Sequence, residues 1–396
     1  MELDGKGQAA EKKMENNQAE MKKIVGKLEG SLVGMNKRIN EAIKNRHDEM
    51  KQDQHKEMAA MKENLCKVNK DVDAVKVMMS QMLEKFNMFE LLSKLPSPTE
   101  GMFNTPREDI LIAGGDCNTA EIFSWEKNGW YDISQMNEEH TAASSFIYND
   151  QLFVVGGLRT KTIETLDLNE LPLKWMEFSD ELPYVSYHQT VVYQQRVIHI
   201  GGYNLDERKT SNVISELQLT SPCALKELCQ MPQPRECHGA EAFEDKVLIL
   251  GGEDDNDDVL DSVLEFDPDK NECKKLPSLP HPMTGMATVR WRDQVVVLGG
   301  CDKDGKVLND VFMYDCKTGK ITALPSMLEK RYDCCAVITG NTIVVMGGKN
   351  DDYDVFSSVE CFTMGGSTWK YLPSMNKERS QAVAEVLPST RKCVYV

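Results

Sequence analysis

Residues 343–348 read Ile-Val-Val-Met-Gly-Gly, a short apolar, mostly β-branched strand that ends in a pair of glycines. The same pattern occurs five more times, at residues 110–115, 152–157, 197–202, 247–252 and 295–300. Successive glycine pairs are 42 to 50 residues apart, a period typical of a small structural unit that is repeated in register. Gly365-Gly366 lacks the preceding strand, and we interpret it as a turn.

More of the unit repeats than the glycines. A second strand follows each glycine pair and carries a large apolar residue near its end, at Phe123, Leu166, Leu217, Phe266, Tyr314 and Phe362. An outer-strand position comes seven to nine residues later, at Trp130, Trp175, Leu225, Cys273, Ile321 and Trp369. A four-stranded unit of about 48 residues cannot bury both of its faces alone, so radial stacking of neighbouring units is expected.

Two stretches carry the resemblance to a known family. The first combines Val311-Phe-Met-Tyr-Asp, Leu324-Pro-Ser-Met, Arg331 and the glycine pair at 347–348. The second combines Trp369, Leu372-Pro-Ser-Met and Arg379. Both resemble the kelch repeat of the BTB-kelch (kelch-like) proteins, over roughly residues 107–396. The resemblance implies an all-β, six-bladed β-propeller with four-stranded blades, which we place at residues 108–396 after a linker at 96–107.

The C-terminus is predicted to close the ring of blades. The chain enters the first blade at its glycine-pair strand, so the innermost strand of that blade must come from elsewhere. Residues 380–387 have the composition of such a strand and no blade of their own. Residues 392–396 resemble the start of another glycine-pair strand, for which this scheme has no place.

The first 95 residues are predicted to form a long α-helical coiled coil. No proline occurs before Pro96, and apolar residues repeat every three or four positions at Met58, Met61, Leu65, Val68, Val72, Val75, Met79, Met82, Phe86 and Phe89. Flanking charges are opposite in three pairs, Glu57–Lys62, Asp71–Lys76 and Lys85–Glu90, which favours a parallel homo-oligomer. Dimer and trimer fit equally well. The coiled coil takes the place that the BTB domain has in BTB-kelch proteins, which argues against cullin recruitment.

Charge and composition argue against several functional classes. The net charge is −17, and residues after 95 carry 28 basic against 47 acidic residues, so nucleic acid and anionic membranes would repel them. No apolar run is long enough to span a bilayer, and residues 1–20 do not read as a signal peptide. We therefore expect a cytoplasmic protein whose 12 cysteines are reduced thiols.

No catalytic chemistry is predicted. The seven histidines show no metal-ligand spacing, and the cysteines form no C-x-x-C motif. Some kelch propellers are copper oxidases or sugar-acid isomerases, but nothing in this sequence matches a copper site. We therefore predict a protein that is not an enzyme, without cofactor, metal or catalytic residues.

The turn that leads into each new blade supplies one set of candidate binding residues. Aligned on the spacing Met327-x-x-x-Arg331, the six equivalents are His140, Ser186, Arg235, Met283, Arg331 and Arg379. In kelch family members such arginines reach the binding pocket, which implies that Arg235, Arg331 and Arg379, with His140, bind an acidic peptide. The alternative is an ion pair between each arginine and a carboxylate inside its own blade.

The loops after the glycine pairs supply a second set, which is acidic. The candidate residues are Asp254, Asp255, Asp257, Asp351 and Asp352. Such loops are either simply solvated or attract a basic partner. The arginines and the acidic loops predict partners of opposite charge, and the sequence favours neither.

These features together predict an oligomeric scaffold or adaptor. Its propeller would bind segments of partner proteins, and its coiled coil would bring several propellers together. One alternative is a substrate-recognition adaptor for a ubiquitin ligase. Another is a protein that binds or cross-links actin, because some kelch proteins bundle filaments.

Overall fold

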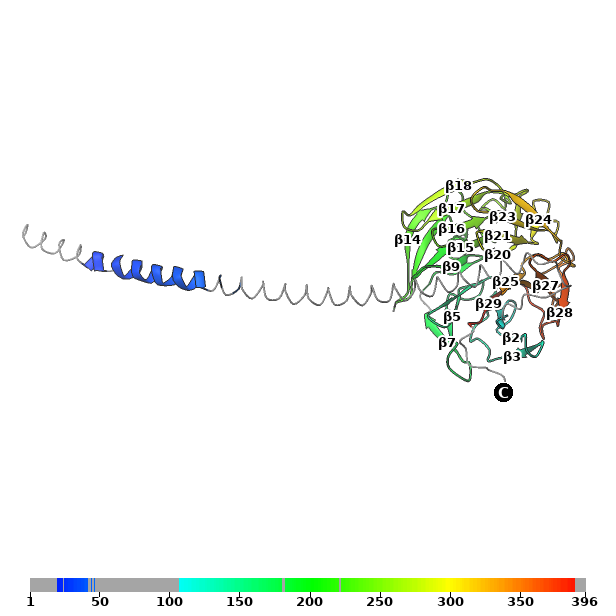
Figure 1. The fold of residues 1–396 in the computed structure, drawn as a ribbon, viewed down its shortest axis with the longest axis horizontal. Coiled ribbons are helices and arrows are strands. Elements are labelled where there is room, and N and C mark those ends of the chain that lie inside the picture. Colours follow the sequence, from blue (N-terminus) through cyan, green and yellow to red (C-terminus); the bar gives the residue numbers. More distant parts are fainter. Residues whose placement is uncertain are drawn as a thin grey trace, which may run out of the picture. The chain divides into compact units, whose positions relative to one another are not determined.

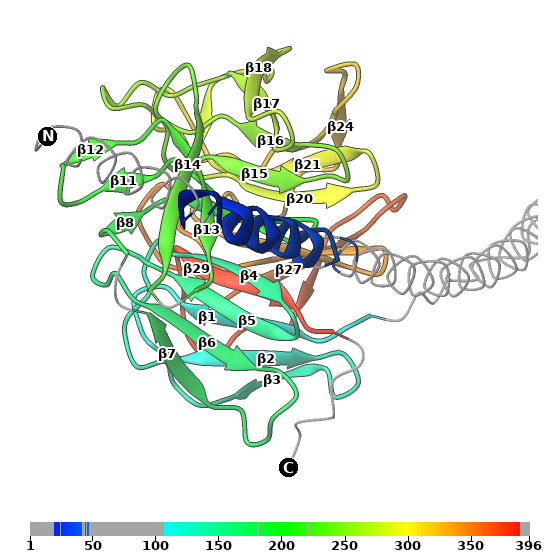
Figure 2. The same ribbon diagram turned by 90° about the vertical axis from the view of Figure 1, so that its left-hand side faces the viewer.

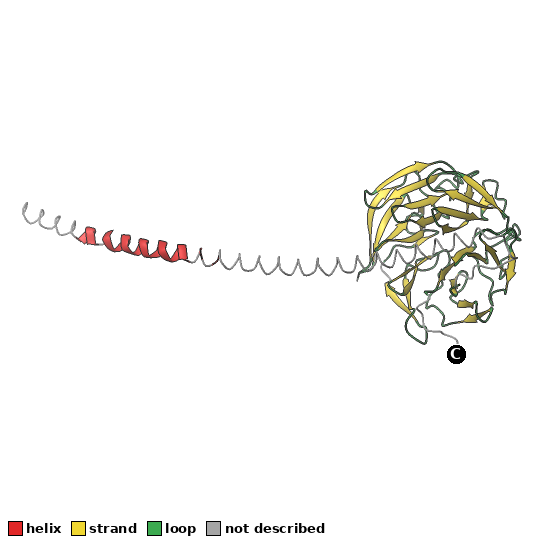
Figure 3. Ribbon diagram, viewed as in Figure 1, coloured by secondary structure: helices red, strands yellow, loops and turns green. Residues whose placement is uncertain are grey.

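The computed structural model describes residues 20–23, 25–41, 44, 46, 107–179, 182–220 and 222–388. The chain divides into two units, Met1–Met102 and Phe103–Val396. The described residues of the first unit are helical, and those of the second form strands and loops (Figure 3). The two units therefore differ in their secondary structure.

The helix of the first unit spans residues 20–23 and 25–41 (Figure 1). Its apolar side chains are exposed in the single chain, with Leu28 at 63%, Leu32 at 60% and Ile39 at 47%. The apolar repeat predicted from Met58 to Phe89 lies outside the described residues, as does the linker apart from its last residue. The coiled coil therefore stays a prediction.

Six four-stranded antiparallel sheets form the described part of the second unit, together with short strands in the loops. Strands are given in order from the axis outward. The first sheet contains β29 (Ala382–Val386), β1 (Ile110–Gly114), β2 (Ala120–Ser124) and β3 (Gly129–Asp132). The second contains β4 (Ser144–Tyr148), β5 (Gln151–Val155), β6 (Ile163–Asp167) and β7 (Trp175–Ser179). The third and fourth are β9 (Gln189–Tyr193), β10 (Arg196–Ile200), β13 (Val213–Gln218), β14 (Ala224–Gln230), and β15 (Gly239–Ala242), β16 (Val247–Leu250), β17 (Val263–Asp267), β18 (Glu272–Leu276). The last two are β20 (Ala287–Trp291), β21 (Gln294–Leu298), β23 (Val311–Asp315), β24 (Ile321–Leu324), and β25 (Cys335–Thr339), β26 (Thr342–Met346), β27 (Val359–Thr363), β28 (Lys370–Leu372).

The six sheets are the blades of a closed propeller (Figure 1, Figure 2). Their innermost strands touch in the cyclic order β29, β4, β9, β15, β20, β25 and back to β29. In the first blade β29, from the C-terminal end of the described chain, pairs with β1 over five residue pairs, from Ile110↔Val386 to Gly114↔Ala382. The first blade is thus built from both ends of this unit.

The strand that ends in the glycine pair is the most buried part of each blade. Ile343, Val344, Val345 and Met346 of β26 are all inaccessible to solvent, because the strand lies between two others and is covered on both faces. The glycines that follow have positive φ and no room for a side chain. A Cβ on Gly347 would lie 2.2 Å from the carbonyl oxygen of Arg379, which explains why the repeat requires glycine there.

Short strands tie the loops together at one end of the propeller, which we call the ring face. It comprises the turns before the innermost strands and the loops after the glycine pairs. One three-stranded sheet contains β8 (Val185–Ser186), β11 (Tyr203–Asn204) and β12 (Lys209–Thr210), and a two-stranded sheet contains β19 (Met283–Thr284) and β22 (Cys301–Asp302). Single bridges join Glu236 to Glu253 and Tyr332 to Lys349. The loops of the ring face are therefore held against the turns of neighbouring blades.

Candidate functional site

Six residues, one before each innermost strand, form a closed ring of backbone hydrogen bonds on the ring face. Each N–H donates to the carbonyl oxygen of the preceding member, with N···O distances of 2.8 to 3.0 Å. Each member has a left-handed φ between 50° and 61°, although only one of them is glycine. The members of this central ring are Ala142, Tyr187, Cys237, Gly285, Asp333 and Gln381. The ring connects all six blades and fixes the backbone from which these side chains project.

The central ring surrounds a pocket of about 100 Å³. Three of its side chains are linked, because Gln381 Nε2 donates to Asp333 Oδ2 at 2.8 Å and to the Tyr187 hydroxyl at 3.3 Å. Burial raises the pKa of Asp333, although the hydrogen bond from Gln381 opposes this effect. Burial and the nearby charges of Cys237 and Asp333 raise the pKa of Tyr187. The three linked side chains of the pocket are therefore a carboxyl group, a neutral phenol and an amide.

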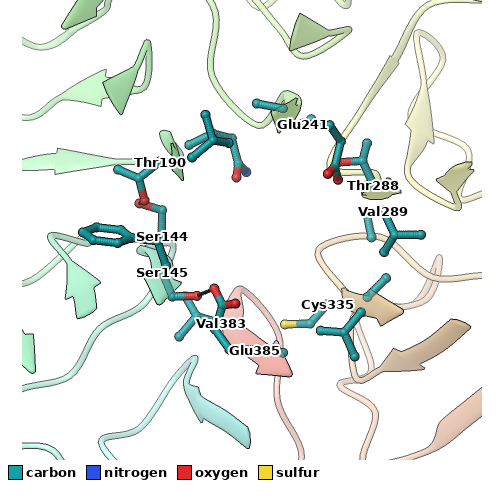
Figure 4. A pocket seen from close by; sticks show the side chains of 18 of the residues that line it. Ser144, Ser145, Thr190, Glu241, Thr288, Val289, Cys335, Val383 and Glu385 are labelled. Atoms are coloured by element: carbon teal, nitrogen blue, oxygen red, sulfur yellow. Dashed lines mark hydrogen bonds between the residues drawn. The ribbon is translucent and has the colours of Figure 1, made fainter. Parts of the chain in front are cut away.

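The pocket shares Ala143, Gln189, Met286, Cys334 and Ala382 with a channel along the propeller axis, a cavity of about 630 Å³ lined by the innermost strands. Glu241 and Glu385 lie on different walls of this channel (Figure 4). Ser145 Oγ donates to Glu385 Oε1 at 2.7 Å. Burial raises the pKa of both glutamates to about 7. The channel thus contains two carboxyl groups that titrate near neutral pH.

Carboxylates gather around the pocket on the ring face. Burial first, and then the charges of Glu253 and Asp257, raise the pKa of Glu236 to about 7. Glu253 is affected in the same way, because its own burial and then the charge of Asp257 raise its pKa. Burial, followed by the charges of Asp333, Asp351, Asp302 and Glu253, raises the pKa of the Cys301 thiol to about 12. These acidic groups belong to the turns and loops of three blades on the ring face, and we call the surface that they form the acidic face. Its residues are Glu236, Glu253, Asp255, Asp257, Asp302, Asp351 and Asp352.

The predicted acidic residues divide into two groups in the structure. Asp254 is buried, and its Oδ1 accepts the N–H groups of Asn256 and Asp258, so it shapes the loop. Asp351 is exposed and accepts hydrogen bonds from the N–H of Val307 and from Lys330. Exposed carboxylates remain at Asp255, Asp257 and Asp352. Of the five predicted residues, these three therefore face solvent and do not hold a loop in place through hydrogen bonds from backbone N–H groups or from a lysine.

The predicted arginines lie inside the blades. Arg235, Arg331 and Arg379 are exposed by 0%, 0% and 1%. The first Nη atom of each donates to the carbonyl oxygen of the first glycine of a pair, at Gly251, Gly347 and Gly114 respectively. Arg331 also pairs with Glu360 at 2.8 Å, and Arg379 with Glu121 at 2.9 Å. Arg235 instead donates to Ser262 Oγ at 2.9 Å.

The internal ion pair, the second of the two alternatives, thus describes Arg331 and Arg379, while Arg235 has a neutral partner. In all three the guanidinium holds the glycine turn and the second strand of its blade. Since these side chains are surrounded by protein, they do not reach a ligand on the ring face in this structure. The expectation of an acidic partner, which depended on them, loses its basis.

His140 has the same internal role in another blade. Its ring contacts the carbonyl oxygen of Gly156 at 2.7 Å and Glu164 Oε1 at 3.2 Å. Burial raises the pKa of Glu164, but the hydrogen bonds from His140 and from the backbone N–H of Asn137 and Glu138 outweigh it and lower the pKa.

In the third blade the sequence alignment that selected Ser186 is wrong by one residue. Gly157 N–H bonds to the carbonyl oxygen of Val185, so Val185 and not Ser186 is the equivalent position.

Sequence reasoning missed the central ring, although a simple rule locates it. Each member lies two residues after the equivalent buried position, as Asp333 follows Arg331 and Gln381 follows Arg379. With Val185 in place of Ser186, the same offset gives Tyr187. The signal was present in the spacing, but the six residue types have nothing in common.

The chemistry of a metal or of a reactive thiol is not evident in the described residues. No group of three His, Cys, Asp or Glu among them is placed to hold a metal ion. His188 and His199 stack at a centroid distance of 4.7 Å, and burial lowers the pKa of both, to about 4 for His199. Burial raises the pKa of the Cys334 thiol to about 12. These groups are therefore neutral near pH 7.

A pH dependence follows from Glu385. Because its pKa in the folded chain is about 7, above the usual value of 4.5, folding favours the protonated form, and this stabilisation is lost as the pH rises from about 4.5 to about 7. Glu385→Gln mimics the protonated form. We expect its melting temperature to match the parent near pH 4.5, to exceed it increasingly as the pH rises to about 7, and to exceed it by a constant amount at higher pH.

Thermal melts at four pH values between 5 and 8 test this expectation. The exposed Glu126→Gln serves as the control and should show a constant difference from the parent. A Glu385→Gln variant whose difference from the parent does not grow with pH would show that Glu385 titrates normally.

Comparison with known proteins shows the family of the propeller. A family model described as KLHDC2/KLHL20/DRC7 Kelch-repeats domain matches residues 187–396. Kelch-like protein 35 of Mus musculus is 26% identical over 235 residues, which cover 47% of this chain and 41% of that protein. Beta-scruin of Limulus polyphemus is 23% identical over 163 residues, which cover 38% of this chain and 17% of that protein. The chain thus spans less than half the length of these curated relatives.

A solved structure, titled "Structure of YjhT", has the same fold. It matches with a TM-score of 0.57 and 14% sequence identity, covering 63% of this chain and 88% of that one. At this identity the likeness concerns the fold alone. Within the described residues, no helix is both long enough and apolar enough to cross a membrane.

Proposed function

This chain belongs to the KLHDC2/KLHL20/DRC7 Kelch-repeat family, and from that membership we propose that it is a scaffold or adaptor that binds basic segments of partner proteins. The acidic face of the propeller is the proposed binding surface. The observation that carries the proposal is the division of charge between the two sets of candidate residues. The basic ones are buried and donate hydrogen bonds inside the blades, whereas carboxylates remain exposed on the ring face.

Electrostatic complementarity favours a basic partner. Asp255, Asp257 and Asp352 are exposed, and a backbone bridge joins Glu236 to Glu253 on the same face. Burial is the largest cause that raises the pKa of Glu236 to about 7, and the charges of Glu253 and Asp257 add to it, so an incoming cation would relieve this repulsion. Attraction of this kind increases the association rate and rejects acidic partners.

An aromatic side chain on the same surface adds a contact that charge alone does not supply. Tyr353 follows Asp352 in the loop after the last glycine pair and is 76% exposed. Exposed tyrosines are typical of interface residues that contribute strongly to affinity, and they also stack on cations. We therefore expect Tyr353 to contact a bound segment beside the acidic residues.

Self-association is the second part of the proposal. In the helix of residues 25–41, Leu28, Leu32 and Met35 are exposed by 55% to 63%, which leaves an apolar surface for further copies of the chain. Several propellers in one assembly would bind a repetitive partner with an avidity about 10²–10⁴ times the single-site affinity. Light scattering on the full chain tests this part, and the mass of a monomer would contradict it.

Fluorescence anisotropy with labelled hexalysine and hexaglutamate tests the charge of the partner. We expect the full chain to bind hexalysine and not hexaglutamate. The affinity for hexalysine should fall as salt is raised from 50 to 500 mM, because the screening length then shortens from about 14 to about 4 Å. The combined substitution Asp255→Asn, Asp257→Asn and Asp352→Asn should weaken hexalysine binding at least about fivefold. Asparagine tolerates the positive φ of Asp257, so the loop should be preserved.

A matched control removes three charges from the opposite end of the propeller. Asp150, Glu244 and Asp245 are exposed in turns that join the first and second strands of their blades, away from the ring face. Their amide replacements should change hexalysine affinity less than about twofold, since these charges lie at the other end of the strands and the salt screens them from the site. Equal losses in both triple variants would show that only net charge matters, and preferential binding of hexaglutamate would contradict the proposal.

A further inference from the structure

The pocket inside the central ring contains a carboxyl group without a cationic partner among its lining residues. Asp333 is the only acidic member of the ring, and no Lys or Arg of the described chain lines the pocket. Its Oδ2 accepts the amide of Gln381 at 2.8 Å. Its Oδ1 lies near Gly285, since a Cβ added to that glycine would be 3.0 Å from this oxygen. Oδ1 accepts no hydrogen bond from a described residue. One carboxylate oxygen is thus left for a ligand.

We infer that this pocket binds the primary ammonium group of a lysine side chain that a partner protein inserts along the propeller axis. The inference rests on the proposed function, since the lysine would belong to the basic segment bound by the acidic face. Asp333 supplies the countercharge. The hydroxyl oxygen of Tyr187, which lies on the other side of the Gln381 amide, offers a second acceptor.

Lysine fits this arrangement better than arginine. A guanidinium binds a carboxylate through two parallel hydrogen bonds, which need both oxygens of the carboxylate. At Asp333 the Gln381 amide already donates to one of the two oxygens, so a guanidinium would have to share that oxygen with it. An ammonium group is a compact point charge with three donors, and it needs only single acceptors placed around it.

The walls of the pocket suit the methylene chain of a lysine. Ala142, Ala143, Met286 and Ala382 line it, and the last three also line the channel below. Lysine commonly places its methylenes along apolar surface while its ammonium group contacts a polar partner. The pocket of about 100 Å³ has room for one such side chain and lies beside the larger channel, with which it shares these last three lining residues.

The state of Asp333 in the empty pocket supports binding of a cation. Burial raises its pKa, and the charge of Asp116 adds to that effect, whereas Gln381 and Lys349 oppose it. Ionised Asp333 is therefore less favourable in the empty pocket than the same group in water. A bound ammonium group would compensate for the lost hydration, which makes the interaction specific for a positive charge at this point.

Binding of labelled hexalysine to the full chain and to two single variants tests the inference. Asp333→Asn keeps the shape, the acceptor for Gln381 and a residue type that tolerates the φ of 53°, but it removes the charge. Asp352→Asn removes the same charge from the exposed rim. We expect at least about a tenfold loss of hexalysine affinity for Asp333→Asn and less than about a twofold loss for Asp352→Asn.

Side-chain length gives a second measurement that needs no variant. Hexa-2,4-diaminobutyrate has the same charge as hexalysine, but its side chains are two methylenes shorter and do not reach into the pocket. We expect the parent chain to bind it at least about fivefold more weakly, and hexa-arginine to lose no more affinity with Asp333→Asn than with Asp352→Asn.

The outcomes separate the two proposals. Suppose that hexalysine binds the parent chain and that Asp333→Asn and Asp352→Asn lower its affinity equally. This result would overturn the lysine pocket and leave the proposed role of the acidic face intact. If Asp333→Asn does not fold, equal affinities for hexalysine and its shorter analogue would overturn the pocket by themselves. Hexalysine that does not bind the parent chain would overturn both.

Discussion

A chain that ends at Arg379 is expected to lose cooperative folding. This truncation removes β29, the innermost strand of the first blade, and leaves one edge of β1 without its five residue pairs. It also removes Gln381, so the central ring loses one of its six members and the hydrogen bonds to Ala142 and Asp333. The propeller becomes an open arc whose buried strand edge is exposed to water and to other chains.

The expected loss is as large as the stability of a typical domain. Val383 and Leu387 are buried in the core cluster of the first two blades, and each contributes about 1.5–3 kcal/mol. Each backbone hydrogen bond of β1 that is exchanged for one with water costs about 0.5–1.5 kcal/mol more, against a total stability of about 5–15 kcal/mol. Calorimetry should therefore show no cooperative transition, and light scattering should show aggregates.

A chain that ends at Pro388 is the control for this truncation, because it retains β29 and the ring. It should melt cooperatively. If the chain that ends at Arg379 melts at the same temperature as this control, β29 is not needed to close the propeller.

The repeated strands of the propeller could be predicted from sequence because a physical requirement recurs at fixed spacing. The first glycine after each of these strands has a positive φ and lies against a backbone carbonyl oxygen, as Gly347 does. Only glycine meets both requirements. The six resulting repeats correspond to six four-stranded sheets. The short strands β8, β11, β12, β19 and β22 were not predicted, since two residues are too few for any periodicity.

The site was harder to predict because sequence does not show where a side chain points. Arg331 has the spacing of a ligand-binding residue, and only the structure shows that its guanidinium turns inward to Gly347 and Glu360. The central ring was missed for the opposite reason. Its members share a backbone conformation and a hydrogen-bond pattern but no residue type, so no motif marks Tyr187, Asp333 or Gln381.

The second large effect is expected for Arg379→Ala. The side chain donates to the carbonyl oxygens of Gly114 and Thr119 at 2.8 and 2.9 Å and pairs with Glu121, which is itself inaccessible to solvent. Its removal leaves the Glu121 carboxylate buried without a countercharge. Breaking a buried ion pair in this way costs about 3–5 kcal/mol, which denaturant unfolding of the variant should measure.

Two further variants show whether the loss comes from the buried pair. Arg159→Ala breaks an exposed pair with Glu139, in which the side chains are 73% and 44% exposed, and should cost less than about 1 kcal/mol. Arg379→Met combined with Glu121→Leu removes both charges and should recover part of the stability. Recovery stays partial, because the N–H of Asn376, which donates to Glu121 at 2.7 Å, also loses its acceptor. If the parent binds hexaglutamate, and Arg379→Ala unfolds like the parent but loses that binding, Arg379 would instead be assigned to the binding surface.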